Sequence, residues 1–97
     1  MHVIARKALI DFWARYPDSE QSLSAWYHET KRAEWRTSVD VKKMYGSASV
    51  INAERVVFNI CGNKYRLVVR INYGSGAVFI RFVGTHAEYD AIDAEAV

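Results

Sequence analysis

The chain contains one cysteine, Cys61, and one proline, Pro17, among its 97 residues. A single cysteine excludes an internal disulfide and the paired cysteine spacing of many metal sites. His2, His28 and His86 lie far apart in the sequence and predict no metal site either. No apolar run approaches the ~20 residues that a membrane-spanning helix needs, and the first residues lack the layout of a secretory signal peptide. We therefore expect a cytoplasmic protein that has no contact with membranes.

Acidic residues are absent between Arg55 and Ala87, although five basic side chains lie there. These are Arg55, Lys64, Arg66, Arg70 and Arg81. The formal net charge of +2 is too small to indicate nucleic-acid binding by itself. Its uneven distribution indicates an anionic ligand for this segment, and RNA is the anion that we favour.

Length and composition predict one globular domain that spans residues 1–97. Apolar residues make up 51% of the chain and charged residues 25%, which is typical of a globular protein. A chain of this length builds one hydrophobic core but not two. The first part of the sequence has helical periodicity and the second part has the alternation of strands, with no linker between them.

The first part predicts a short edge strand at Met1–Ile4 and then two amphipathic helices. Apolar residues recur at helical spacing from Ala5 to Tyr16, and Pro17 ends this first helix. Asp18 followed by Gln21 resembles a capping box for the second helix. The stretch 31–45 is predicted as a loop with one short helical turn around residues 41–44.

The second part predicts strands whose register follows from matching apolar faces. A two-residue turn at Gly62 and Asn63 places Phe58 opposite Leu67. In the last strand the same matching places Ile71 opposite Ile80, with a four-residue loop at 74–77. These registers predict three rows of residues across the polar face of the sheet. The rows are Arg55, Arg70 and Arg81; Val57, Val68 and Val83; and Asn59, Arg66 and Thr85.

The two polar rows predict a surface for successive RNA phosphates, because arginines opposed across strands destabilise a sheet unless an anion compensates them. The alternative is a solvated face whose arginines contact water or pair with Asp90, Asp93 and Glu95.

The exit of the last strand carries residues capable of acid–base chemistry. Thr85 followed by Glu88 fits a capping box, so a short helix is expected to begin at His86. His86 could act as a base or hydrogen-bond partner, Tyr89 could stack on a base or relay a proton, and Arg66 could stabilise a phosphorane. The alternative is that this segment only caps a helix and His86 is an ordinary surface residue.

The elements together predict an α+β fold: two N-terminal helices packed on one face of a small, mainly antiparallel, twisted sheet, with a short C-terminal helix. Trp35 lies among Lys31, Arg32 and Arg36, and it is predicted either to contact RNA or to pack in the core.

Several segments, in order along nearly the whole chain, resemble the HigB family of toxins. They are Ile4-Ala5-Arg6-Lys7-Ala8-Leu9, Tyr16-Pro17, Val57-Phe58-Asn59-Ile60, Gly62-Asn63, Arg66-Leu67 and Thr85-His86-Ala87-Glu88-Tyr89-Asp90. The resemblance implies a RelE-like fold and an endoribonuclease that cleaves mRNA on translating ribosomes without a metal or organic cofactor. It further implies inhibition by a HigA-type helix-turn-helix antitoxin, and operator DNA binding only through the toxin–antitoxin complex.

Carried over to this chain, the resemblance implies that Arg66, His86, Tyr89 and Lys64 are catalytic and that Asn59 supports them. Arg55, Arg70, Arg81 and Trp35 are predicted to contact RNA. Two other classes stay open: a toxin of the ParE type, which acts on gyrase and cleaves no RNA, and a binding module for RNA or an acidic protein without catalysis.

Overall fold

A five-stranded sheet with the strand order β1-β5-β4-β3-β2 carries the fold in the computed structural model, which describes residues 1–97. The strands are β1 (His2–Ile4), β2 (Ser49–Val50), β3 (Arg55–Ile60), β4 (Tyr65–Asn72) and β5 (Ala77–Thr85). The first strand runs parallel to β5, whereas every other pair is antiparallel. The predicted mainly antiparallel sheet is confirmed.

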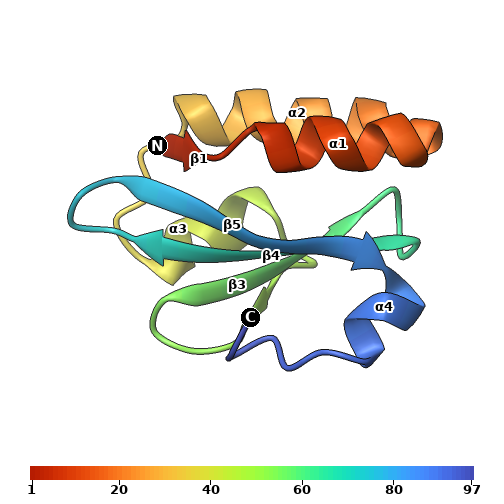
Figure 1. Ribbon diagram of the computed structural model, residues 1–97. Coiled ribbons are helices and arrows are strands. Elements are labelled where there is room, and N and C mark those ends of the chain that lie inside the picture. Colours follow the sequence, from red (N-terminus) through yellow and green to blue (C-terminus); the bar gives the residue numbers. More distant parts are fainter.

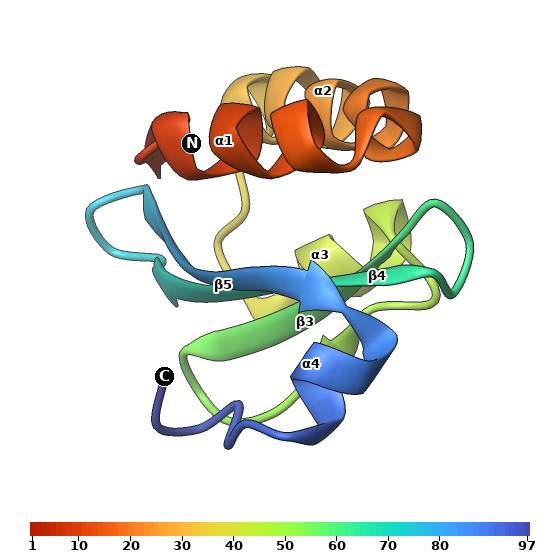
Figure 2. The same cartoon turned by 45° about the vertical axis from the view of Figure 1, so that its right-hand side comes forward.

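Two helices lie side by side over one face of this sheet, and a short helix follows β5 on the opposite side (Figures 1 and 2). The helices over the sheet are α1 (Lys7–Arg15) and α2 (Glu20–Arg32), joined by the 3-10 turn η1 (Pro17–Ser19), and the short helix is α4 (His86–Asp90). None of the helices combines the length and apolarity that crossing a bilayer requires. The predicted α+β architecture with a short C-terminal helix is confirmed.

The hydrophobic core lies between the two long helices and the inner face of the sheet. Leu9 and Phe12 of α1, together with Leu23 and Trp26 of α2, are buried against the sheet. The ring of Trp26 meets the ring of Phe58 edge to face, with 5.4 Å between centroids. Such aromatic contacts orient the helices on the sheet as well as burying apolar area.

The register predicted for β3 and β4 is confirmed. Phe58 lies opposite Leu67, Asn59 opposite Arg66 and Arg55 opposite Arg70. The connecting turn includes Gly62, whose φ of 67° lies in the left-handed region that glycine adopts without strain. Apolar alternation and turn chemistry indicate the same pairing here, which is why the sequence specifies it.

The register predicted for β4 and β5 is wrong. Ile71 lies opposite Val78 rather than Ile80, and a β-bulge between Val68 and Val69 leaves Arg81 without an opposite residue. Beyond the bulge, Arg66 faces Gly84 rather than Thr85. The predicted row of three arginines is therefore a pair, Arg55 and Arg70, and the three-valine row has Phe82 in its third position.

The helix ends contain two further corrections. Asp18 does not cap α2, since its carboxylate accepts hydrogen bonds from Lys64 and Tyr65. The stretch predicted mainly as loop contains a two-turn helix, α3 (Ser38–Met44), which begins with a capping box between Thr37 and Asp40. The short edge strand β2 was not predicted.

The outer face of the sheet is the face that points away from α1 and α2. Strand alternation and the observed registers place eleven residues of β3, β4 and β5 on it. They are Arg55, Val57 and Asn59 of β3, Arg66, Val68, Arg70 and Asn72 of β4, and Ala77, Phe79, Phe82 and Gly84 of β5.

Candidate functional site

Arg66 is the centre of a cluster at the end of the outer face, where the turn between β3 and β4 meets α4. Its Nη1 donates to the carbonyl oxygens of Asn63, at 2.9 Å, and of Tyr65, at 3.3 Å. Its Cζ lies 5.9 Å from the centroid of the Tyr89 ring. Asn59 lies opposite Arg66 in the ladder and donates to the carbonyl of Ser47. The backbone carbonyls and the aromatic ring thus fix the direction of the guanidinium.

The predicted capping box at the start of α4 is confirmed. The Thr85 hydroxyl accepts from the backbone N–H of Glu88 at 3.1 Å, and the Glu88 carboxylate accepts from the N–H of Thr85 at 2.8 Å. This N–H of Thr85 is the main cause that holds the pKa of Glu88 below its ordinary value. The box fixes where α4 begins and therefore where its His86 and Tyr89 lie.

His86 is held to the sheet by its backbone and oriented by a carboxylate. Its N–H donates to the carbonyl of Lys64 at 3.2 Å, and its Nδ1 lies 2.9 Å from Oδ2 of Asp90. When Nδ1 donates to this carboxylate, Nε2 is the ring nitrogen that is free to accept a proton. The imidazole is exposed, so a ligand at the surface can reach it.

Lys64 is the one predicted catalytic residue whose side chain is directed elsewhere. Its ammonium pairs with the carboxylate of Asp18 in η1, and the Tyr65 hydroxyl donates to the same carboxylate at 2.5 Å. The hydrogen bond from Lys64, followed by that from Tyr65, lowers the pKa of Asp18 from its ordinary value of 3.8. Lys64 contributes its carbonyl to the cluster around His86, while its charge tethers the turn to the helices.

The depressed pKa of Asp18 predicts a loss of stability in acid. A carboxyl group whose pKa is lower in the folded state stabilises the fold above its unfolded pKa, and this contribution disappears as the pH falls through the folded pKa. We expect Asp18→Asn to be less stable than the parent at pH 7 and to lose less stability on acidification below about pH 4. Urea unfolding at pH 7 and pH 3 measures both. Tyr65→Phe, which removes one donor, should give an intermediate result, and an unchanged acid loss in Asp18→Asn would contradict the assignment.

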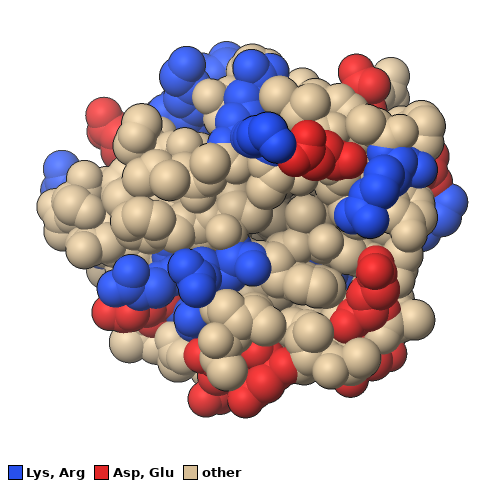
Figure 3. Space-filling model, viewed as in Figure 1, with Lys and Arg blue, Asp and Glu red and all other residues tan.

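Basic side chains gather over one end of the sheet, with acidic side chains directly beside them (Figure 3). Arg70 pairs with Glu54, with 2.8 Å between Nε and Oε2. Arg55 donates to the backbone oxygens of Ala94 and Val97, and Arg81 donates to that of Val97 at 3.1 Å. The opposed arginines are thus compensated within the protein, by Glu54 and backbone oxygens rather than by Asp90, Asp93 or Glu95.

The residues after α4 form a covering segment, 91–97, on the outer side of the sheet (Figures 1 and 2). Val57 is 4% exposed and Val68 0%, although both point away from the core. Ile92 and Ala94 of the covering segment are half-buried, whereas Asp93 and Glu95 are exposed. The segment therefore shields the middle of the outer face with its apolar side and turns its acidic side to solvent.

Trp35 belongs to the core and does not lie on the predicted RNA surface. It is 4% exposed, and its ring stacks on that of Phe58 with 6.2 Å between centroids. A base needs an open aromatic face on which to stack, so the predicted contact of Trp35 with RNA is wrong.

The cluster around Arg66 is an open surface rather than a pocket. The largest cavity, of about 530 Å³, lies elsewhere, between residues 33–36 and the loop that joins β4 to β5. No three His, Cys, Asp or Glu side chains lie close enough together to hold a metal ion. The chemistry available at the cluster is that of a guanidinium, an oriented imidazole and a phenol. Sequence reasoning missed the orienting role of Asp90, which its position four residues after His86 could have revealed.

Comparison with known proteins identifies the family. Residues 19–92 match the family model of the HigB toxin, described as a RelE-like toxic component of a toxin-antitoxin system. The chain belongs to the HigB toxin family. The mRNA interferase toxin HigB of Escherichia coli strain K12 and the mRNA interferase HigB of Shigella flexneri are each 32% identical to it over 92 residues. These alignments cover 93% of this chain and 88% of each relative.

A more distant relative, the mRNA interferase HigB of Escherichia coli O6:H1, is 22% identical over 94 residues, which cover 95% of this chain and 91% of that protein. The family predicted from the sequence is therefore confirmed, and the observed α+β fold agrees with the RelE-like fold expected of a HigB toxin.

Proposed function

We propose that this HigB-family chain is an endoribonuclease toxin that cleaves mRNA with the side chains gathered where β4 meets α4. The observation that carries the proposal is the arrangement of Arg66 beside the Tyr89 ring, next to an imidazole oriented by Asp90. A cation, a phenol and an oriented imidazole can supply the charge stabilisation and the proton transfers that phosphodiester cleavage needs. The names of the relatives, mRNA interferase HigB, support the same substrate.

The proposed reaction is attack of a ribose 2′-OH on the adjacent phosphorus. The O2′–P bond forms as the P–O5′ bond breaks, and the products are a 2′,3′-cyclic phosphate and a free 5′-OH. The 2′-OH loses its proton to a base, and the leaving O5′ gains one from an acid, so no water or oxidant enters this step. The phosphorane carries extra negative charge, which a fixed cation stabilises.

We assign the roles from the contacts of each side chain. His86 Nε2 accepts the 2′-OH proton, because Asp90 holds Nδ1 and so orients the free nitrogen outward. Tyr89 donates a proton to O5′, and its place over Arg66 keeps both groups at the same phosphate. Arg66 stabilises the phosphorane, while Asn59 and Lys64 support the site from the neighbouring strand and the turn.

Arg55, Arg70 and the bulge residue Arg81, farther along the sheet, are proposed to bind the RNA backbone. Arg70 is paired with the side-chain carboxylate of Glu54, whereas Arg55 and Arg81 contact only backbone oxygens of the covering segment. We therefore take Arg55 and Arg81 as the preferred RNA contacts.

We further propose that cleavage occurs on translating ribosomes in the cytoplasm and needs no metal ion. A HigA-type helix-turn-helix antitoxin would neutralise the toxin, and operator DNA would be bound only through that complex. Retained activity in a chelator, with a 5′-OH on the downstream product, is the expected result. A 5′-phosphate or loss of activity in the chelator would refute the proposed chemistry.

His86→Ala tests the site in a cell-free translation reaction. Purified protein should cut mRNA at positions that primer extension maps, and ribosome-free RNA should stay intact. We expect the variant to lose about 100-fold or more in cleavage rate, since general acid–base groups contribute about 10²–10⁴-fold. His28→Ala, which changes an exposed histidine of α2, is the matched control and should cut like the parent.

The possible outcomes separate the classes of function. Cleavage that survives in His86→Ala would keep the enzyme but move the base to another residue. Intact mRNA combined with growth arrest and DNA damage would favour a gyrase-directed toxin, and salt-dependent RNA binding without cleavage would favour a binding module.

A further inference from the structure

The β-bulge in β5 turns Phe82 from the core to the outer face. Unbroken alternation from Val78 and Ile80 would point Phe82 at the helices, but the unpaired Arg81 shifts the pattern by one residue. Phe82 then lies opposite Val68, and Val83 takes the inward position opposite Leu67. Bulges are common next to active sites, where they redirect a side chain.

Gly84 provides the space that the Phe82 ring occupies. A Cβ atom added at Gly84 would lie 2.5 Å from Cζ of Phe82 and 3.1 Å from Oε1 of Glu88. The first distance is shorter than Cβ contacts in proteins and the second is tight, so a side chain at Gly84 would displace the Phe82 ring from its place along β5 toward the start of α4. Gly84 is also the residue opposite Arg66, and the ring therefore ends beside the strand position of the proposed phosphate-binding arginine.

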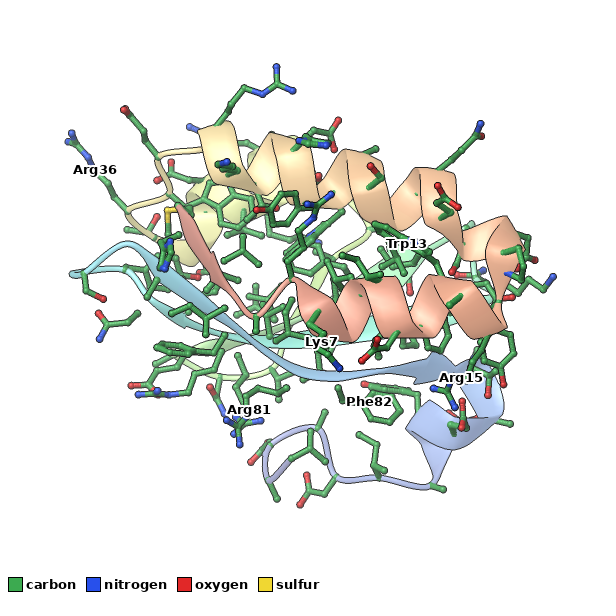
Figure 4. The ribbon with its side chains drawn as sticks, turned by 45° about the horizontal axis from the view of Figure 1, so that its top comes forward. Lys7, Trp13, Arg15, Arg36, Arg81 and Phe82 are labelled. Carbon is green, nitrogen blue, oxygen red and sulfur yellow. The ribbon has the colours of Figure 1, made fainter.

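The surroundings of Phe82 are cationic on both sides along the strand. Arg81 precedes it, and Figure 4 shows both side chains between β5 and the covering segment. Arg66 with Tyr89 lies at the other side, beyond Gly84. Phe82 is half-buried, so it is not sealed in the core as Trp35 is. An aromatic residue flanked along the strand by Arg81 and, beyond Gly84, by Arg66 suits single-stranded RNA, whose bases alternate with phosphates.

We propose that Phe82 is a positioning residue on which a base of the RNA stacks next to the cleaved phosphate. Gly84, which has no side chain, leaves the space for the Phe82 ring. This inference rests on the proposed function and assigns a base contact to it. Stacking at Phe82 fixes the nucleotide while Arg66 holds its phosphate. The residue raises affinity and alignment, and it takes no part in proton transfer.

The test compares Phe82→Leu with Phe82→Tyr and with the matched control Phe79→Leu. Phe79 lies on the same face of the same strand, but the Arg70 guanidinium covers its ring, with Cζ 5.7 Å from the centroid. The probe is a short single-stranded RNA with 2′-O-methyl riboses and 2-aminopurine in place of adenine, offered free and bound to ribosomes. Stacking on an aromatic ring quenches 2-aminopurine fluorescence. A variant that only loosened the packing of the protein would leave this quenching unchanged.

We expect Phe82→Leu to bind the probe about tenfold more weakly and to abolish the quenching, as base–aromatic stacking contributes on that scale. Phe82→Tyr should restore both, and Phe79→Leu should behave like the parent. Urea unfolding of each variant confirms that the measurements use folded protein. Parent-like binding and quenching in Phe82→Leu would overturn the inference alone. A parent protein that binds the probe in neither form would refute the proposed function as well.

Discussion

Replacing Arg66 with alanine should lower the rate of RNA cleavage by about 100- to 1,000-fold. A single fixed donor to the developing charge contributes on this scale, and Arg66 is held in place by two backbone carbonyls and the Tyr89 ring. Alanine removes the charge without disturbing the ladder, because the side chain is half-buried on the outer face and makes no core contact. Single-turnover cleavage, with RNA affinity measured in parallel, is the appropriate experiment.

Arg55→Ala is the contrasting variant for this prediction. Arg55 holds the covering segment at the far end of the face, so its loss should weaken RNA binding and reduce the salt slope of binding by about one. The cleavage rate of bound RNA should change little. If both variants lowered rate and affinity equally, the division between a reacting end and a binding end of the outer face would be wrong.

Phe58→Ala should lower the free energy of unfolding by about 3–5 kcal/mol, the usual cost of deleting a buried aromatic ring. Phe58 is 1% exposed and its ring contacts those of Trp26, Trp35 and Tyr45. Its removal leaves a cavity beneath both α2 and the segment that precedes α3. Because a domain of this size is stable by roughly 5–15 kcal/mol, the variant should be close to unfolding at 37 °C. Urea titration followed by tryptophan fluorescence measures the change.

Two controls bracket the Phe58 result. Phe58→Leu keeps most of the volume and should cost less than the alanine variant. Val39→Ala truncates an apolar side chain of α3 that is 59% exposed, and it should change stability by no more than about 0.5 kcal/mol. A loss below about 1 kcal/mol in Phe58→Ala would show that this ring is not central to the core.

The sequence specifies the fold where two independent signals agree. For β3 and β4, the alternation of apolar residues and the Gly62 turn both place Phe58 opposite Leu67. For α4, Thr85 and Glu88 form a reciprocal cap that is local in sequence. The two helices over the sheet follow from periodicity and Pro17. In each case the deciding interactions join residues that are close along the chain.

The sequence does not specify features that depend on tertiary contacts. Residues 77–83 are apolar at nearly every position, so a register with or without a bulge at Arg81 matches apolar to apolar equally well. Asp18 has the local pattern of a cap, but Lys64 and Tyr65, 46 and 47 positions away, compete successfully for its carboxylate. Trp35 stands among basic residues, and its burial depends on contact with Phe58.

The same limit applies to the candidate site. The proximity of Arg66 to Tyr89 was anticipated, because a turn and a cap fix these positions locally, and the roles of Arg66, His86 and Tyr89 stay predictions. The sequence did not predict that the bulge turns Phe82 outward, or that Arg55 and Arg81 donate hydrogen bonds to residues 91–97. Each of these features depends on a segment that is distant in the chain.

The parallel pairing of β1 with β5 has a consequence for when a growing chain can become toxic. His2 lies opposite Ala77, so the first strand has no partner until residues 77–79 have been synthesised. Contacts between such distant segments form late and slowly in folding. Arg66 on β4 lies beside β5, and α4 follows β5. A nascent chain that lacks β5 and α4 therefore has neither the five-stranded sheet nor the complete cluster around Arg66. The order of the strands thus completes the proposed site around Arg66 only after residues 77–90 have been synthesised.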